Sequence, residues 1–282
     1  MFLPQDKINR IIDAALEEDL VQRDITTTVL ISPEVSGSAH IRAKGTGILA
    51  GVRVAEAVFK RVDDALNFQI KIADGNRVTP GVEIAAITGS AASILKAERT
   101  ALNFLQRMSG IATLTAQYVA AVAGLPVHIL DTRKTVPGLR MLDKYAVKMG
   151  GGENHRFHLG DAILIKDNHL AILHARGMSL AEIVAQARQR AGPDIKIEVE
   201  VQSVADAHIA AKAGANVIML DNMTPDEMRH AVKEVGDIVL LEASGGINLD
   251  TVRTIAETGV DFISVGALTH SVKALDISLD MD

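Results

Sequence analysis

Apolar and polar positions follow two different periods along the chain. Residues 8–16, INRIIDAAL, repeat apolar side chains at helical spacing, which predicts an amphipathic first helix. Residues 36–51 and 66–89 alternate polar with apolar and carry Asp-Gly and Pro-Gly turn signals, which indicates a small antiparallel sheet. Ser90 is placed to cap a further helix, which we expect to end at Gly110.

From about residue 111, short apolar strands alternate with segments of helical length. Residues 204–214, 224–236 and 248–259 each end in glycine, as helices with glycine C-caps do. A repeat of roughly 20 residues is typical of a parallel α/β array. Because no Gly-x-Gly-x-x-Gly opens a helix, we favour a TIM-like barrel over a doubly wound sheet, and six strands would leave it incomplete. The predicted strands are 127–130, 162–165, 196–201, 216–220, 238–243 and 262–265.

The change of period predicts two domains, an α+β domain over residues 1–110 and a barrel over residues 111–270. With 282 residues and 48% apolar content, the chain can bury a core in both.

The formal net charge is −6 without a run of like charges, which argues against a nucleic-acid or membrane-binding surface. We find no candidate transmembrane helix or signal peptide and expect a cytoplasmic protein. The absence of cysteine excludes disulfides, thiolate nucleophiles and cysteine-ligated metals, so that the chemistry must use Lys, Arg, His, Asp or Glu.

Every predicted strand ends in a polar residue or glycine. Reactive groups of a barrel lie on the loops that leave the carboxyl ends of its strands. One polar end would mean little because loops are usually polar, but six in register indicate a site. The residues at these ends are Asp131, Arg133 and Lys134; Lys166, Asn168 and His169; Glu200; Asp221 and Asn222; Ser244, Gly245 and Gly246; and Gly266 before His270.

A local excess of cations lies within this negatively charged chain. Residues 131–169 hold seven Lys or Arg and three His against five Asp or Glu, which suits a small polyanion better than nucleic acid. Glycines 150–152, which precede Asn154, His155 and Arg156, permit either close approach of a ligand or a plain turn.

Glu200 and Asp221 are the carboxylates at consecutive strand ends, where they would reach one Mg²⁺ ion or a sugar diol, or else pair with neighbouring cations. Glycines after the last two strands, in ASGG and VGA, favour phosphate binding through backbone N–H groups. Together these features predict a phosphorylated sugar site. Arg99, beside the apolar face of its helix, is either a rim residue or reaches into a neighbouring subunit's site.

Specific motifs are spread along the chain: DTRKTVPGLRMLDKYAVKMGGGENHRFHLGDAILIKDNH, EVEV, IMLDNM, EASGGI and VGALTHSVKALDISL. Together they resemble the quinolinate phosphoribosyltransferases, also called carboxylating nicotinate-nucleotide pyrophosphorylases. The resemblance covers nearly the whole chain, from EEDL and RDITT near its start to the last ten residues. It implies an N-terminal α/β sandwich onto which residues 271–282 pack back, and an incomplete TIM-like barrel. It also implies a homodimer in which one N-terminal domain covers the other barrel's mouth, with further assembly left open.

The activity that the resemblance implies is transfer of phosphoribose from phosphoribosyl pyrophosphate to quinolinate. The products would be nicotinate mononucleotide, pyrophosphate and CO₂, on the de novo route to NAD, with Mg²⁺ and without an organic cofactor. The resemblance assigns the quinolinate carboxylates to Arg133, His155, Arg156 and Lys166, with Arg99 donated across the dimer interface. The donor and its metal would be held by Lys134, Glu200, Asp221, Ser244, Gly245 and Gly266. Lys134, Glu200 and Asp221 would be catalytic, and the two carboxylates would bind the metal directly or through substrate and water.

Alternatives remain at this point. The family motif Glu-Asp-Leu-Gly-x-Gly-Asp is altered here, since Val21 and Arg23 replace both glycines. A relative associated with molybdenum transport, acting on or binding a different anionic acceptor, is the main alternative. Two further alternatives are a regulatory protein that binds a sugar phosphate, and an isomerase or lyase that uses Lys166 as a base or Schiff-base amine.

Overall fold

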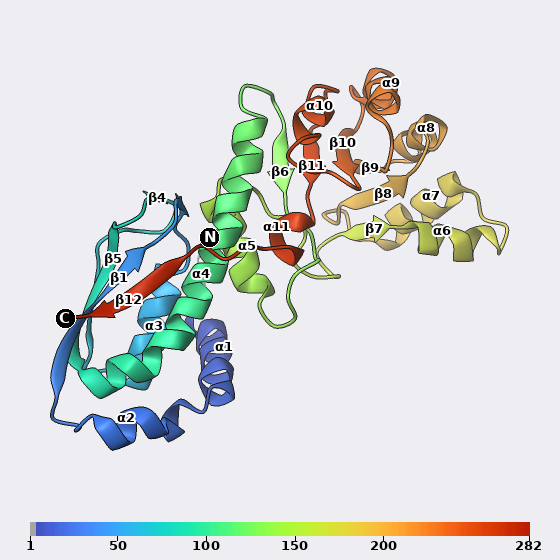
Figure 1. Ribbon diagram of the computed structural model, residues 1–282. Coiled ribbons are helices and arrows are strands. Elements are labelled where there is room, and N and C mark those ends of the chain that lie inside the picture. Colours follow the sequence, from blue (N-terminus) through green and yellow to red (C-terminus); the bar gives the residue numbers. More distant parts are fainter. Residues whose placement is uncertain (1–3) are drawn as a thin grey trace. The chain divides into compact units, whose positions relative to one another are not determined.

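The computed structural model describes residues 4–282, apart from the side chain of Gln22. Its contacts separate two compact units, which differ in the type of sheet they contain (Figure 1). The first unit combines residues up to 116 with residues 135–151 and 268–282, and the second consists of residues 117–134 and 152–267. The chain thus returns to the first unit twice after residue 116, over residues 135–151 and over residues 268–282.

The first unit is built on an antiparallel sheet with strand order β12-β1-β5-β3. Alternation buries Ala39, Ile41 and Ala43 on one face of β1, which confirms the sheet predicted from the sequence. Ile41 lies opposite Ala85 of one neighbouring strand and Leu279 of the other. The strands are β1 (Ser36–Ala43), β3 (Asn67–Ile70), β5 (Glu83–Ser90) and β12 (Ile277–Met281), with a separate pair β2 (Gly47–Ile48) and β4 (Arg77–Val78).

Helices complete this unit. The predicted first helix lies within α1, where Ile8 and Ile12 are buried. Where Val21 and Arg23 replace the family's glycines, the chain forms a short 3₁₀ turn entered through Leu20 in the left-handed region, φ 48°. The elements are α1 (Gln5–Glu18), the 3₁₀ turn Val21–Arg23, α2 (Ile25–Leu30), α3 (Val52–Val62), α4 (Ala91–Ala121) and α5 (Arg140–Met149).

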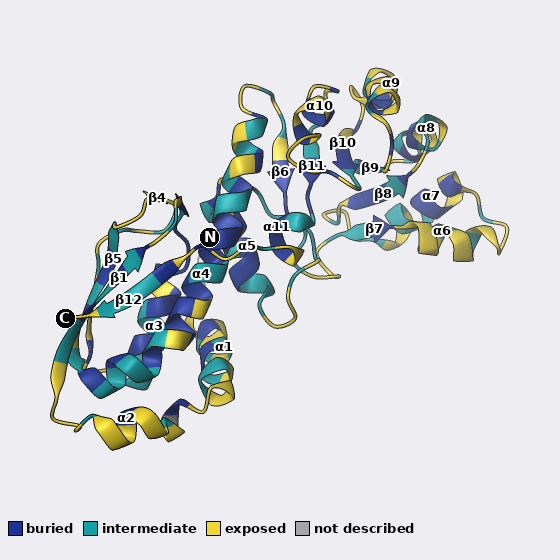
Figure 2. Cartoon of the chain, viewed as in Figure 1, coloured by how far each residue is buried: buried dark blue, intermediate teal, exposed yellow. Residues whose placement is uncertain are grey.

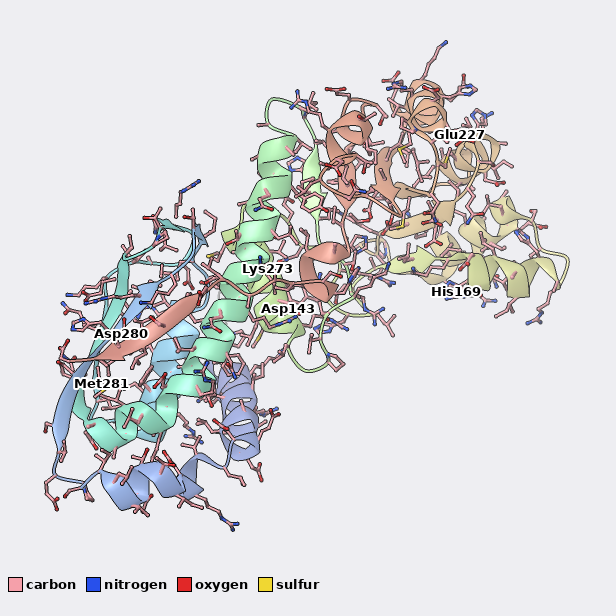
Figure 3. The ribbon with its side chains drawn as sticks, viewed as in Figure 1. Asp143, His169, Glu227, Lys273, Asp280 and Met281 are labelled. Carbon is pink, nitrogen blue, oxygen red and sulfur yellow. The ribbon has the colours of Figure 1, made fainter. Side chains whose placement is uncertain are left out.

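The long helix α4 shows where the sequence pattern misled. The expectation that this helix ends at Gly110 is wrong, because the helix continues to Ala121. Gly110 is needed for another reason: a Cβ there would collide with the backbone carbonyl of Lys273, which runs alongside α4 (Figure 3). This glycine therefore permits close backbone packing and does not cap the helix.

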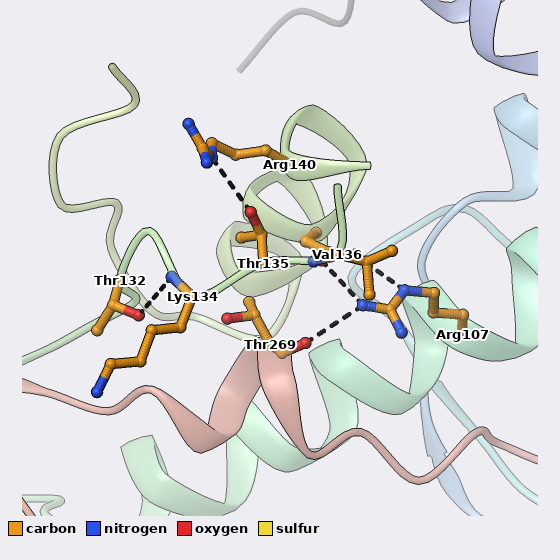
Figure 4. A network of polar contacts seen from close by, with 8 residues as sticks. Arg107, Thr132, Lys134, Thr135, Val136, Arg140 and Thr269 are labelled. Carbon is orange, nitrogen blue, oxygen red and sulfur yellow. Dashed lines mark hydrogen bonds and ion pairs between the residues drawn. The ribbon is translucent and has the colours of Figure 1, made fainter. Parts of the chain in front are cut away.

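A buried ion pair ties α4 to α5 within the first unit. The carboxylate of Asp143 is fully buried and accepts from Nε and Nη2 of Arg107 at 3.0 and 2.9 Å. Arg107 also donates to the carbonyl of Thr269 at 3.2 Å (Figure 4). The N–H of Val136 donates to Asp143 at 3.3 Å. Burial raises the pKa of Asp143, and the Arg107 hydrogen bond acts in the opposite direction.

The second unit contains six parallel strands in the order β6-β11-β10-β9-β8-β7. All six predicted strands are confirmed, and because β6 and β7 remain the outer strands, the fold is an incomplete TIM-like barrel, as expected. The strands are β6 (His128–Leu130), β7 (Ile163–Ile165), β8 (Ile197–Val201), β9 (Val217–Asp221), β10 (Leu240–Ser244) and β11 (Phe262–Ser264).

The helices between these strands bury small and aliphatic side chains such as Val184, Ala207 and Ala231 (Figure 2). They are α6 (Asp167–His174), α7 (Leu180–Arg190), α8 (Val204–Lys212), α9 (Pro225–Val235) and α10 (Val252–Ala256), and α11 (Ala267–His270) follows β11. Within residues 4–282, no helix has both the length and the apolar composition that a membrane span requires.

We expect Gly110→Ala to lower the free energy of unfolding by about 1–3 kcal/mol, because the added methyl group must displace the Lys273 backbone. In an unconstrained helix interior the same change would stabilise by up to about 1 kcal/mol. Thermal unfolding checks this, with Gly160→Ala as the control, since a Cβ at Gly160 meets nothing within 4 Å. A Gly110→Ala protein as stable as the parent would contradict the packing argument.

Candidate functional site

A cavity of ≈ 650 Å³ opens in the second unit at the carboxyl ends of the strands. This volume is typical of sites for small organic molecules. Of the residues to which the family resemblance assigns a role, all line it except Arg99 and Gly266. Those that do are Arg133, Lys134, His155, Arg156, Lys166, Glu200, Asp221, Ser244 and Gly245.

Strand register brings the carboxylates and Lys166 together. Glu200 and Met219 are partners across β8 and β9, as are Asp221 and Ser244 across β9 and β10, so their side chains share the face that lines the cavity. Lys166 follows β7, and its Nζ lies 3.3 Å from Oε2 of Glu200.

Two neighbouring loops are fixed by an unusual backbone. Asn222 has φ 55°, and its N–H donates to the carbonyl of Ser244 at 2.9 Å. Gly245 has φ 97°, and a Cβ there would collide with the side-chain oxygen of Asn222. Asn222 in turn donates from Nδ2 to Asp221 at 2.9 Å. Glycine at position 245 is therefore required both by conformation and by space.

The guanidinium groups of Arg133 and Arg156, which both line the cavity, repel each other electrostatically. Burial lowers the pKa of Arg156, and the charge of Arg133 lowers it further. Arg156 donates from Nη1 to the carbonyl of Ala162 at 3.0 Å. Nε of Arg133 is buried and has no hydrogen-bond partner among the described residues. A buried charged donor without an acceptor is costly, so the site is suited to an anion.

The loop that carries His155 and Arg156 is anchored by hydrogen bonds to a buried aspartate. Asp131, at the end of β6, is fully buried and accepts from Nδ2 of Asn154 at 2.6 Å and from the N–H of His155 at 2.9 Å. Nε2 of His155 lies 2.9 Å from Oε2 of Glu198 and 3.6 Å from Oε2 of Glu242.

Glu198 and Glu242 were not among the residues predicted from the sequence, because only strand ends were considered. The available signal was the spacing of Glu198 and Glu200, two apart in one strand and therefore on one face. Burial, followed by the charge of Glu198, raises the pKa of Glu242 to about 8.

Two groups of residues have the chemistry to hold a cation. Glu200 and Asp221 offer oxygen ligands to the cavity, and such a pair fits Mg²⁺, which usually keeps waters and substrate phosphates as its other ligands. His155, Glu198 and Glu242 also place one ligand atom each within 4.8 Å of one another.

The remaining predicted residues lie elsewhere. Arg99 is exposed on α4 in the first unit, and Gly266 follows β11 without lining the cavity. Gly150 fits against the carbonyl of Ala112, and Gly151 takes φ 86°, so these glycines serve packing and a turn. His169 accepts from the N–H of Lys166 at 2.9 Å and thereby caps α6.

An open parallel α/β barrel with cations and paired carboxylates around one cavity defines a class of proteins that bind small, multiply charged anions. The sequence matches the quinolinate phosphoribosyl transferase N-terminal domain over residues 24–109 and the C-terminal domain of the same name over residues 111–280. The chain belongs to the quinolinate phosphoribosyl transferase family.

Individual relatives agree with this assignment along the whole chain. The probable carboxylating nicotinate-nucleotide pyrophosphorylase of Bacillus subtilis is 44% identical, over 98% of this chain and 93% of that protein. The crystal structure of NadC from Streptococcus pyogenes shares the fold, with 41% identity and a TM-score of 0.95 over 100% of this chain and 99% of that one. The structure of the nicotinate-nucleotide pyrophosphorylase from Francisella tularensis does so too, with 37% identity and a TM-score of 0.94 over 100% of this chain and 98% of that one.

The raised pKa of Glu242 predicts a pH effect on stability. The folded protein holds this proton more tightly than the unfolded chain, so its free energy of unfolding falls between pH values of about 4.5 and 8. Gln mimics the protonated carboxyl group. We expect Glu242→Gln to gain thermal stability relative to the parent as pH rises from about 5 to about 9. A stability difference that does not change with pH would contradict this.

Proposed function

We propose that this protein transfers phosphoribose from phosphoribosyl pyrophosphate to quinolinate, with decarboxylation, to give nicotinate mononucleotide, pyrophosphate and CO₂ in de novo NAD biosynthesis. The names of its relatives support this activity. The observation in the chain itself that carries the proposal is the buried, unpartnered Nε of Arg133 beside Arg156. We expect the reaction to take place in the cytoplasm.

Quinolinate is a pyridine dicarboxylate, and two adjacent carboxylates need several fixed cations. Arg133, Arg156 and Lys166 line the cavity and supply them, and His155 lies on the same loop as Arg156. Arginine suits this role because its planar fork binds a carboxylate in two places. The partner subunit's Arg99 would add a further cation.

The phosphoribosyl donor would lie beside the carboxylates Glu200 and Asp221, which also line the cavity. Lys134 and Mg²⁺ would bind the pyrophosphate, and Glu200 and Asp221 would bind the metal and the ribose hydroxyls. Ser244, Gly245 and Gly266 would offer hydroxyl and backbone N–H donors to phosphate, as glycine-rich loops at barrel strand ends commonly do.

The chemistry has two stages. The pyridine nitrogen attacks the anomeric carbon as its bond to pyrophosphate breaks, and Lys134 stabilises the departing negative charge. Glu200 or Asp221 stabilises the positive charge that develops on the ribose ring. The alkylated ring then accepts the electron pair left when the adjacent carboxylate departs as CO₂, and a proton takes its place.

Incubation with quinolinate, phosphoribosyl pyrophosphate and Mg²⁺ tests this proposal, with CO₂ and nicotinate mononucleotide as readouts and nicotinate as a parallel acceptor. We expect both products from quinolinate and none from nicotinate. Turnover of nicotinate, or donor binding without turnover, would refute the quinolinate assignment. Borohydride trapping of a substrate on Lys166 would favour the Schiff-base alternative.

Within this assay, we expect Arg133→Lys to raise the KM for quinolinate about tenfold or more, because lysine keeps the charge but loses the fork of donors. The KM for phosphoribosyl pyrophosphate should change little. Arg229→Lys is the matched control, since Arg229 is an exposed residue of α9 paired with Asp226. Equal quinolinate KM values for the parent and Arg133→Lys would contradict the assigned role.

We further propose a homodimer in which each acceptor site receives Arg99 from the other subunit. Arg99 is exposed on α4, as such a role requires. Helix α2 supports an interface in the first unit, because Ile25, Val29 and Leu30 are 78%, 74% and 71% exposed (Figure 2). Three apolar side chains on one short exposed helix are typical of a surface that a partner covers.

Subunit mixing tests the shared site. Arg99→Ala and Arg133→Ala proteins should each be nearly inactive. After exchange in equal amounts they should recover about a quarter of the parent activity, because half of the dimers are mixed and each has one intact site. Exchange is checked by an affinity tag on one of the two proteins, which must then retain the untagged one, and sedimentation checks that the protein is a dimer. Mixed dimers without recovered activity, or an active monomer, would rule out the shared site.

A further inference from the structure

We propose that Glu198, supported by Glu242, is a positioning residue for the acceptor site: it fixes the imidazole of His155 and, through it, the backbone of Arg156. This inference rests on the proposed function, because it concerns the same cavity. It assigns a role to two carboxyl groups in the interior of the strands: Glu198, which does not line the cavity, and Glu242, which does.

The contacts form a continuous chain from the sheet to the loop. Glu198 lies on β8 and Glu242 on β10, with side chains only 6% and 2% exposed. Nε2 of His155 is within hydrogen-bond distance of Glu198, at 2.9 Å, and Glu242 approaches the same nitrogen at 3.6 Å. The Nε2 side of the imidazole is therefore held by two strands of the sheet.

The second ring nitrogen of His155, Nδ1, connects the imidazole to the backbone of Arg156. The backbone N–H of Arg156 donates to Nδ1 of His155 at 2.9 Å. A nitrogen that accepts a hydrogen bond carries no proton, so the neutral ring has its proton on Nε2 and donates it to Glu198. Both nitrogens thus have defined and opposite roles, and rotation of the ring would break both bonds.

The position of Arg156 matters because its guanidinium and that of Arg133 would together bind the carboxylates of the acceptor. Arg156 donates to the carbonyl of Ala162, and its backbone is bound to His155. Two fixed cations match two fixed carboxylates, whereas a shift of about 1 Å in such an arrangement costs on the order of a hundredfold in rate. Support beneath the binding residues is therefore part of the acceptor site.

Glu198 also affects the site by charge, since its carboxylate partly offsets the repulsion between the two guanidiniums. Charge and hydrogen bonding predict different results for glutamine at this position. Glu198→Gln loses the charge but keeps an oxygen that accepts from Nε2, whereas Glu198→Leu loses both.

The experiment measures KM for each substrate, and the affinity of benzene-1,2-dicarboxylate by calorimetry, in the parent, Glu198→Gln and Glu198→Leu. For Glu198→Leu we expect a rise of about tenfold or more in the quinolinate KM and a matching loss of dicarboxylate affinity, with the donor KM within about twofold. Glu198→Gln should stay within about threefold of the parent on every measure.

Three results would overturn the proposal. Glu198→Leu could leave the quinolinate KM unchanged, or impair both substrates equally, which would indicate a general structural role. Alternatively Glu198→Gln could be as defective as Glu198→Leu, which would assign the effect to charge. If the parent itself neither binds the dicarboxylate nor turns over quinolinate, the proposed function fails, and that result is distinct from all three.

Glu153→Leu is the matched control for these variants. It removes a carboxylate that pairs with a different histidine, since Glu153 lies 2.9 Å from Nδ1 of His128. Both side chains of that pair are about half exposed, and neither lines the cavity. We expect Glu153→Leu to leave both KM values unchanged. Thermal unfolding of each variant checks that it is folded at the temperature of the assay.

Discussion

Parallel register is the constraint on which the site depends. Because side chains alternate along each strand and all six strands run in one direction, residues from distant parts of the sequence meet at the carboxyl edge. Asp221 and Ser244 are partners in adjacent strands, and Glu200 lies beside them although it is far away in sequence. A shift of one residue in any strand would turn its functional side chain to the helix-covered face.

The same register brings charges of both signs to a small volume. Glu198 is buried outside the lining of the cavity, whereas the buried Glu242, Arg133 and Arg156 all line it. Burial of charge is expensive unless it is paired, so each group influences the protonation of the next. The raised pKa of Glu242 and the lowered pKa of Arg156 are two results of one arrangement. An anion in the cavity would complete the balance of charge.

Much of this site could be predicted from sequence because strand ends are visible as polar residues after short apolar runs. Arg133, Lys166, Glu200 and Asp221 were found in this way. Glu198 and Glu242 were missed because a charged residue inside a strand reads as solvent-facing until a partner such as His155 is known. Gly110 was misread for a similar reason, since glycine signals a helix end in sequence but serves close backbone contact here. Such contacts between distant segments leave no local signature.

The C-terminal strand gives the fold a further property. Strand β12 pairs with β1, so the sheet of the first unit is completed by residues 277–281, after the whole second unit. On the ribosome, the second unit has therefore been made before the first can close its sheet. The edge of β1 stays unpaired until then, and an open edge invites pairing with other chains. The edge of β1 is thus covered only after the second unit has been made.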